Sequence, residues 1–195
     1  PGFVTGRAAD LELAANGDLF ASLGILGRSV VLKSSFATHG VNTGALGNWT
    51  DITPVTPTVT QRTEIVLAPS DAQRVYLLMQ DSATSQVLNI FRSTNGGNSW
   101  TTLNAPSALN NGANSQTWFN LTGAVDPNNA NILIVGGLNL ARSTDAGDNW
   151  TTISSSATVH VDHHALVFDG SSRLINGNDG GIYFSANINA GTPTF

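Results

Sequence analysis

The sequence of 195 residues predicts an all-β fold built from several small antiparallel sheets, and three observations support this prediction. Short apolar runs rich in Val, Ile, Leu, Phe and Tyr alternate with segments rich in Asn, Asp, Gly, Pro and Ser, which is typical of strands joined by tight turns. No stretch shows the 3.6-residue apolar periodicity of a helix. Trp49, Trp100 and Trp150 lie about fifty residues apart, so the chain repeats one unit.

Each repeat contains an apolar run, a turn, a second apolar run and a third run that ends in Ser. The four copies are "ADLELAANGDLFASLG" into "SVVLKSS", "TEIVLAPSDAQRVYLLMQ" into "NIFRSTNGG", "LTGAVDPNNANILIVGG" into "NLARSTDAG", and "HALVFDGSSRLINGND" into "GIYFSANIN". A repeat of about 40 to 50 residues that folds as a four-stranded antiparallel sheet is typical of a β-propeller blade. We therefore predict one propeller segment over residues 1–195, with blades at approximately 1–54, 55–106, 107–156 and 157–195.

The composition limits the classes of partner. Only 11% of the residues are charged, the formal net charge is -5 and there is one lysine, so electrostatic binding to nucleic acid is not expected. No apolar stretch is long enough to insert into a membrane. Cysteine is absent, which excludes disulfides and thiolate metal ligands. Abundant Asn, Thr, Ser and Gly with almost no Lys indicates an extracellular or cell-surface bacterial protein.

Two copies of one turn sequence, "RSTNGGNSW" and "RSTDAGDNW", resemble the Asp-box pattern Ser-x-Asp-x-Gly-x-x-Trp. The matching residues are Ser93, Asn95, Gly97 and Trp100 in the first copy, and Ser143, Asp145, Gly147 and Trp150 in the second. A looser, stretched copy runs from Ser34 to Trp49, and "SANINAGTPTF" is similar to a fourth with Phe195 in the Trp place.

Such Asp boxes, also called BNR repeats, occur in sialidase-like, sortilin-like and xyloglucanase-like propellers, and the whole chain resembles this superfamily. The resemblance is closest to large secreted bacterial Asp-box proteins labelled glycosyl hydrolases. It implies glycan as a partner. It also implies a propeller of six or more blades, so we expect further blades or a partner chain to complete the ring.

The boxes are expected to stabilise turns and not to perform chemistry. An Asp or Asn side chain accepts hydrogen bonds from turn N–H groups, a glycine at Gly97 or Gly147 allows a positive φ, and the Trp covers the hairpin. Because Asn95 stands where the sister copy has Asp145, the turn requires an acceptor and not a charge. A general acid or nucleophile could not be exchanged in this way.

Chemistry is better sought in the fourth repeat. "HVDHHALVFD" places His160, Asp162, His163 and His164 within five residues, and "NGNDGGIYFS" places Asp179 in the loop between the second and third strands. The blade topology brings that loop close to the start of the first strand. On an extended strand, His160, Asp162 and His164 share one face while His163 points the other way.

Three interpretations of this group remain open. His160, Asp162 and His164 suit a divalent metal such as zinc, although no other cofactor is predicted. Alternatively, Asp162 and Asp179 act as the paired carboxylates of a glycoside hydrolase, with His163 and His164 binding substrate. "NDGGIY" resembles the stretch in which xyloglucanase-like propellers carry a catalytic Asp, which implies Asp179 for that role. In the third interpretation these side chains only position loops.

Trp118 lies outside the box register, in "TWF". It is either a stacking platform for a sugar ring or a packing residue between blades. The sequence thus predicts either a glycan-directed propeller similar to glycoside hydrolases or a non-catalytic propeller that binds proteins or surfaces.

Overall fold

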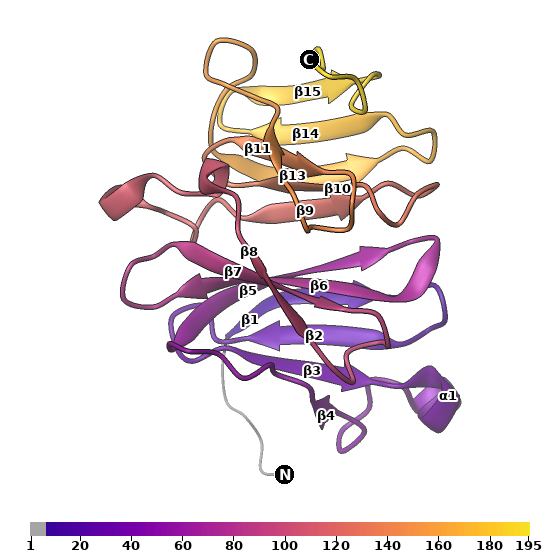
Figure 1. Cartoon of the computed structure of the whole chain (residues 1–195). Coiled ribbons are helices and arrows are strands. Elements are labelled where there is room, and N and C mark those ends of the chain that lie inside the picture. The colour runs from indigo at the N-terminus through magenta and orange to yellow at the C-terminus, as the bar shows by residue number, and fades with distance from the viewer. Residues whose placement is uncertain (1–6) are drawn as a thin grey trace.

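The computed structural model describes residues 7–195, and it confirms the all-β prediction: four antiparallel sheets are arranged as the blades of a propeller (Figure 1). The first six residues of the predicted first blade lie outside the described part. Each sheet is a meander in which consecutive strands pair. The first blade contains β1 (Ala8–Leu13), β2 (Leu19–Leu23), β3 (Val30–Ser34) and β4 (Thr50–Asp51). The second contains β5 (Thr60–Ala68), β6 (Asp71–Asp81), β7 (Val87–Ser93) and β8 (Thr101–Asn104).

The third blade contains β9 (Thr122–Val125), β10 (Leu133–Gly136), β11 (Leu140–Ser143) and β12 (Thr151–Thr152). The fourth has three strands, β13 (His163–Phe168), β14 (Leu174–Asn178) and β15 (Gly181–Ser185). Two insertions carry short helices. α1 (Phe36–His39) and η1 (Gly40–Asn42) lie within the stretched first box, and η2 (Ser107–Leu109) and η3 (Gly112–Asn114) lie between the second and third blades. Within residues 7–195 no helix has the length and apolarity needed to cross a membrane.

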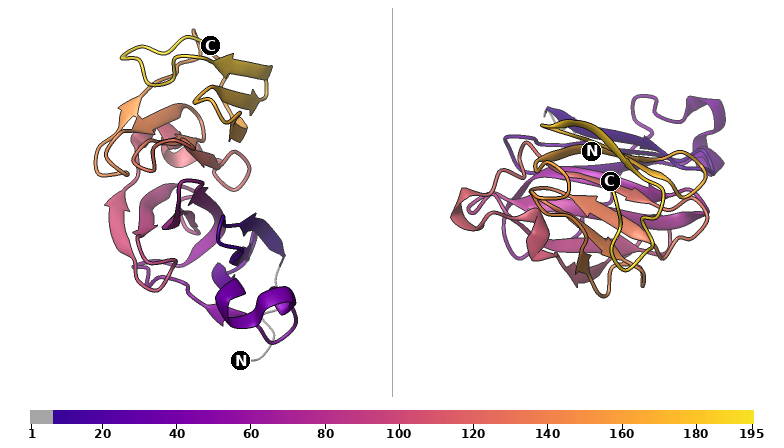
Figure 2. Two further views of the ribbon diagram at one scale, coloured as in Figure 1. Left: turned by 90° about the vertical axis from the view of Figure 1, so that its right-hand side faces the viewer. Right: turned by 90° about the horizontal axis from the view of Figure 1, so that it is seen from above.

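The blades form an arc, with the first and fourth blades at opposite ends (Figures 1 and 2). The first strands of neighbouring blades contact one another, β1 with β5, β5 with β9 and β9 with β13. They are therefore the inner strands of the arc, and charged or aromatic residues near their beginnings share one region of the molecule.

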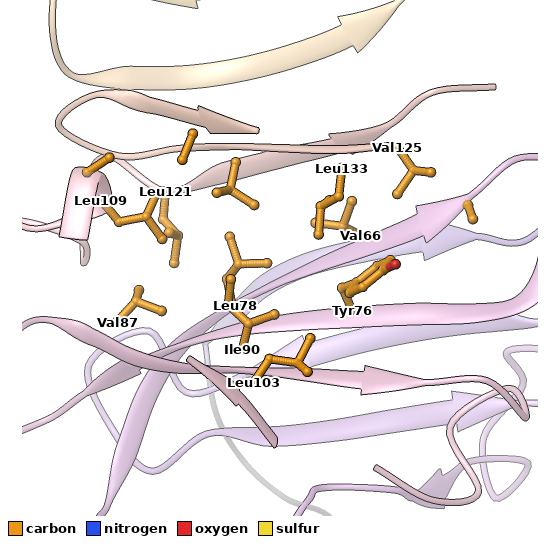
Figure 3. Packing of buried hydrophobic residues seen from close by; sticks show 14 residues of the cluster. Val66, Tyr76, Leu78, Val87, Ile90, Leu103, Leu109, Leu121, Val125 and Leu133 are labelled. Carbon is orange, nitrogen blue, oxygen red and sulfur yellow. The ribbon is translucent and has the colours of Figure 1, made fainter. Parts of the chain in front are cut away.

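The hydrophobic core lies between blades and not within one sheet. Between the second and third blades, Tyr76 and Leu78 of β6 pack with Leu121 and Leu133 of the next blade (Figure 3). All four side chains are fully buried. Since burying a large apolar side chain stabilises a protein by about 1.5–3 kcal/mol, these layers hold successive blades together.

The box turn of the third blade is organised around two side chains. Ser143 Oγ donates to Asp145 Oδ1 (2.8 Å) and accepts from the N–H of Gly147 (2.7 Å), whose φ is +94°. Asp145 also accepts from the backbone N–H (2.8 Å) and the Nδ2 (2.7 Å) of Asn149. These hydrogen bonds from Asn149 and Ser143 lower the pKa of Asp145. Both carboxylate oxygens are thus engaged within the turn.

The box turn of the second blade has the same backbone contacts with a different outer partner. Ser93 Oγ donates to Asn95 Oδ1 (2.9 Å) and accepts from the N–H of Gly97 (2.8 Å). Asn95 accepts from the N–H of Ser99 (2.9 Å), but its Nδ2 donates to the Ser99 hydroxyl (2.8 Å). The change from Asp145 to Asn95 is therefore matched four residues later. There Asn149 donates from its amide, whereas Ser99 accepts with its hydroxyl.

Each box also connects its blade to the neighbouring one. The indole Nε1 groups of Trp100 and Trp150 donate back to carbonyls of the preceding blade or its linker, Ile52 (2.8 Å) and Asn104 (3.1 Å). In the first three blades, the basic residue just before the box Ser reaches forward to a carbonyl in the next box turn. These forward contacts are Lys33 to Gly96 (2.8 Å), Arg92 to Ala146 (2.9 Å) and Arg142 to Ala190 (2.6 Å).

The two ends of the arc expose apolar side chains. Leu11 and Leu13 on β1 are 64% and 66% exposed, and Ile182 and Phe184 on β15 are 83% and 59% exposed. Phe184 occupies the place that the basic residue holds in the other three blades, directly before the last Ser of its strand. Both ends therefore carry the kind of surface that packs between blades elsewhere in the chain.

Candidate functional site

The structure brings His164 and Asp179 together at the inner strands. His164 Nε2 lies 2.7 Å from Asp179 Oδ1, and the N–H of Asp179 donates to the carbonyl of Asp162 (3.3 Å). His164 is on β13, and Asp179 is in the turn from β14 to β15, which is the proximity that the blade topology predicts. The two side chains are 30% and 46% exposed. Because the carboxylate accepts the Nε2 proton, Nδ1 of the neutral ring is left to accept a proton.

The predicted shared strand face of His160, Asp162 and His164 is wrong. β13 begins only at His163, and Asp162 precedes it with a φ of +62°, which an extended strand does not allow. Its N–H donates to the carbonyl of Leu138 (3.2 Å), and its Oδ1 accepts from Nδ2 of Asn120. The Nδ1 atom of His160 lies 3.0 Å from the carbonyl oxygen of Val161, the next residue in the chain. Across residues 7–195, no group of three or more His, Cys, Asp or Glu side chains is placed to hold a metal ion.

His163, the second predicted substrate-binding histidine, is fully buried. Its Nδ1 lies 3.0 Å from Oδ1 of Asn176, which is also fully buried. Burial lowers the pKa of His163, so the ring is neutral near pH 7. An amide oxygen can only accept, so Nδ1 carries the proton. The structure thus separates the two neighbouring histidines, one inside the fold and one at the surface.

Two exposed aromatic residues adjoin the His164–Asp179 pair. Trp118 and Phe119 are 48% and 46% exposed, and their ring centroids lie 5.6 Å apart. The Phe119 ring contacts the His164 imidazole edge-to-face, with centroids 4.5 Å apart. We call Trp118, Phe119, His164 and Asp179 the inner-strand site. It combines an apolar surface with an oriented imidazole and a carboxylate.

Arg62, near the start of β5, holds the aromatic pair from the second blade. Its Nη1 donates to the carbonyls of Phe119 (2.6 Å) and Trp118 (3.1 Å), and its Nη2 donates to the carbonyl of Leu121 (2.8 Å). The Arg62 side chain is 15% exposed. One guanidinium group thereby fixes the backbone of the segment that presents both rings.

Three carboxyl groups line the inner strands next to Arg62. Glu64 Oε2 lies 3.4 Å from Arg62 Nη2, and burial, with a further contribution from Asp10, raises the pKa of Glu64 to about 8. Burial and the nearby Asp10 also raise the pKa of Glu12 to about 7. Burial raises the pKa of Asp10 itself, although its Oδ2 accepts from the N–H of Ile65 (2.7 Å). Glu64 is therefore mostly protonated at pH 7, and its contact with Arg62 is a hydrogen bond to a neutral carboxyl group.

The sequence motifs do not point to Asp10, Glu12, Arg62 or Glu64. Their spacing offers a signal: Asp10 and Glu12, like Arg62 and Glu64, lie two positions apart on the first strand of a repeat, in a chain that has only 11% charged residues. Residues two apart on a strand share a face, and the first strand of a blade lies innermost.

This arrangement of sheets defines a β-propeller segment, and comparison with known proteins supports the same class. No family model and no curated protein sequence matches the chain. Among solved structures, the chain is similar to the GH74 enzyme of Niastella koreensis, with 22% identity and a TM-score of 0.66, covering 92% of this chain and 28% of that one. It is also similar to YCF48 bound to D1 peptide, with 12% identity and a TM-score of 0.60, covering 93% and 51%.

A third similar structure is a catalytically inactive histidine variant of virginiamycin B lyase from Staphylococcus aureus with quinupristin, at 15% identity and a TM-score of 0.62, covering 97% and 56%. The chain thus spans from about a quarter to about half the length of these three proteins. At such identities the similarity establishes the propeller fold and no particular activity.

Proposed function

We propose that the inner-strand site binds a glycan and that the protein acts on it in the manner of a glycoside hydrolase. The observation that carries this proposal is the exposed Trp118–Phe119 pair packed against the His164–Asp179 pair. Aromatic faces suit the apolar C–H surface of a sugar ring. The GH74 enzyme of Niastella koreensis, a similar fold, adds support at the level of the fold alone.

In this proposal the residues of the site have separate roles. Trp118 stacks against a sugar ring, and Asp179 orients the His164 ring through Nε2. His164 Nδ1 then acts as a general base and takes a proton from a water molecule, whose oxygen bonds to the anomeric carbon. The glycosidic C–O bond breaks at the same carbon, and the leaving oxygen takes up a proton from solvent. Asp162 supports the site and does not react, because its Oδ1 and its backbone already bind Asn120, Leu138 and the turn at Asp179.

The test is binding and turnover on a panel of plant and bacterial glycans, followed by calorimetry on any ligand found. Trp118→Ala is expected to weaken binding at least tenfold, and Asp179→Ala to lower turnover by a factor of about 10² or more. Asp169→Ala is the matched control, since this exposed carboxylate in the β13–β14 turn contacts only its own turn and Arg173. Equal activity in Asp179→Ala and the wild type removes the catalytic proposal. Unchanged binding in Trp118→Ala removes the proposed stacking role.

A non-catalytic role in assembly is the second proposal, and it rests on the apolar ends of the arc. Ile182 and Phe184 at one end, and Leu11 and Leu13 at the other, match the surfaces that pack between blades within the chain. We propose that further propeller blades or a partner chain cover these ends. The similar protein YCF48 was solved with a peptide bound, which supports a binding role for this fold.

Phe184→Lys is expected to reduce concentration-dependent association in analytical ultracentrifugation and the binding of an apolar dye. Thr102→Lys, on the solvent-facing β8, is the control. A monomer that binds no dye at any concentration argues against exposed blade faces. We further propose an extracellular or cell-surface location in a bacterium, which cell fractionation tests.

A further inference from the structure

We propose that Arg62 is a positioning residue that fixes the Trp118–Phe119 pair beside His164. This inference rests on the proposed function of the inner-strand site, but it concerns the geometry of the site before any ligand binds.

The aromatic pair lies in a long connection, residues 105–121, between β8 and β9. Connections of this length without regular strands are usually mobile or functional. Here the end of the connection is held from two sides. From the second blade, Ser85 accepts a hydrogen bond from the Thr117 hydroxyl (2.6 Å), and Arg62 donates to three carbonyls of the backbone.

The fourth blade holds the same segment from the other side. Asn120 donates to Asp162, and the Phe119 ring rests on the edge of His164. The segment therefore joins the second blade to the fourth across the third. The position of both rings relative to His164 depends on where Arg62 places the backbone carbonyls.

Only an arginine side chain fits this arrangement. A guanidinium group presents five N–H donors in a rigid plane, and here three of its hydrogen bonds go to carbonyls of Trp118, Phe119 and Leu121. A lysine keeps the charge next to Glu64, but its compact ammonium group on a flexible stem cannot hold three fixed acceptors in one plane. If charge alone mattered, Arg62→Lys would behave as the wild type.

The experiment uses the chain labelled with 5-fluorotryptophan. The chain has four tryptophans and so gives four ¹⁹F resonances. Trp118→Phe assigns the signal of Trp118. Imidazole ¹H–¹⁵N spectra report His164 in the same samples. Three variants are compared with the wild type: Arg62→Lys, Glu64→Gln, and Arg74→Lys as the matched control on the neighbouring strand β6.

Arg62→Lys is expected to shift or broaden the Trp118 signal and to move the His164 ring signals, because Phe119 no longer rests on the imidazole. The signals of Trp49, Trp100 and Trp150 should stay in place, as should all four in Glu64→Gln and Arg74→Lys. Unchanged Trp118 and His164 signals in Arg62→Lys overturn the proposal. A shift of all four indole signals also overturns it, since the role of Arg62 would then be general stability.

A measurement on the wild type covers the case in which Arg62→Lys does not fold. The three hydrogen bonds should slow rotation of the Arg62 guanidinium group and give separate Nη1 and Nη2 signals. Averaged Nη signals contradict the proposal. These readouts use no ligand, so they remain valid if no glycan binds. If a glycan does bind, Arg62→Lys should weaken it by about tenfold, while Arg74→Lys leaves the affinity unchanged.

Discussion

Replacing Glu64 with glutamine should remove the largest single part of the loss of stability that we expect as pH rises from about 5 to 8. Burial holds the pKa of Glu64 at about 8, compared with 4.5 for a free glutamate. Between these values the folded chain keeps a proton that the unfolded chain has released. The free energy of unfolding therefore falls with rising pH in this window, and the contribution of Glu64 is fully present only below about pH 4.5.

The size of this effect follows from the two pKa values. At about 1.4 kcal/mol per pH unit, the interval between 4.5 and about 8 corresponds to about 5 kcal/mol. A glutamine side chain has the same shape and cannot ionise, so Glu64→Gln should be several kcal/mol more stable than the wild type at pH 8 and nearly equal to it at pH 4.5. Glu12, with its pKa raised to about 7, should leave a smaller slope of the same sign.

The assay is urea denaturation at half-unit steps from pH 4.5 to pH 8.5. Asp71→Asn, a change of charge at a half-buried residue on the same blade, serves as the control and should run parallel to the wild type. If Glu64→Gln keeps the slope of the wild type, or is less stable than the wild type at pH 8, the buried, protonated state assigned to Glu64 is refuted.

Three further predictions concern the turns and the contacts between blades. Asp145→Asn alone should lower the free energy of unfolding by about 1 kcal/mol, because the new amide faces the donor amide of Asn149. Adding Asn149→Ser should restore the lost stability, as measured by thermal denaturation. Gly97→Ala should lower the free energy of unfolding by about 2 kcal/mol or more in the same measurement, since φ is +88° and the new Cβ would lie 2.7 Å from Ile52 Cδ1. A stability equal to that of the wild type would contradict this account. Arg92→Met should cost about 1–3 kcal/mol by losing its hydrogen bond to the next blade, and hydrogen exchange should rise first at the seam between the second and third blades.

The repeat period made the fold predictable from sequence. Trp49, Trp100 and Trp150 set the spacing, and the turns between them fixed the order of strands. The proximity of Asp179 to His164 also followed from topology, because a meander returns its second loop to the start of its first strand. Both conclusions depend on local pattern and chain order alone.

The remaining features depend on contacts that sequence does not reveal. On an extended strand Asp162 would share a face with His160 and His164, but its left-handed backbone prevents the strand from beginning before His163. Arg62 contacts carbonyls more than fifty residues later in the chain, so its role depends on how two blades pack. The exchange of Asp145 for Asn95 indicates that the turn requires an acceptor and not a charge, and both side chains accept from the same turn positions. What the sequence does not reveal is that the partner changes as well, from Asn149 to Ser99.

The forward contacts of Lys33, Arg92 and Arg142 connect each blade only to the next one. If these were the only contacts, the arc would be a one-dimensional array whose blades unfold separately. The segment ending at Leu121 breaks this pattern, since it binds the second and fourth blades at once. Cooperativity should therefore differ along the chain. The second, third and fourth blades should unfold as a single unit, while the first blade can open without them.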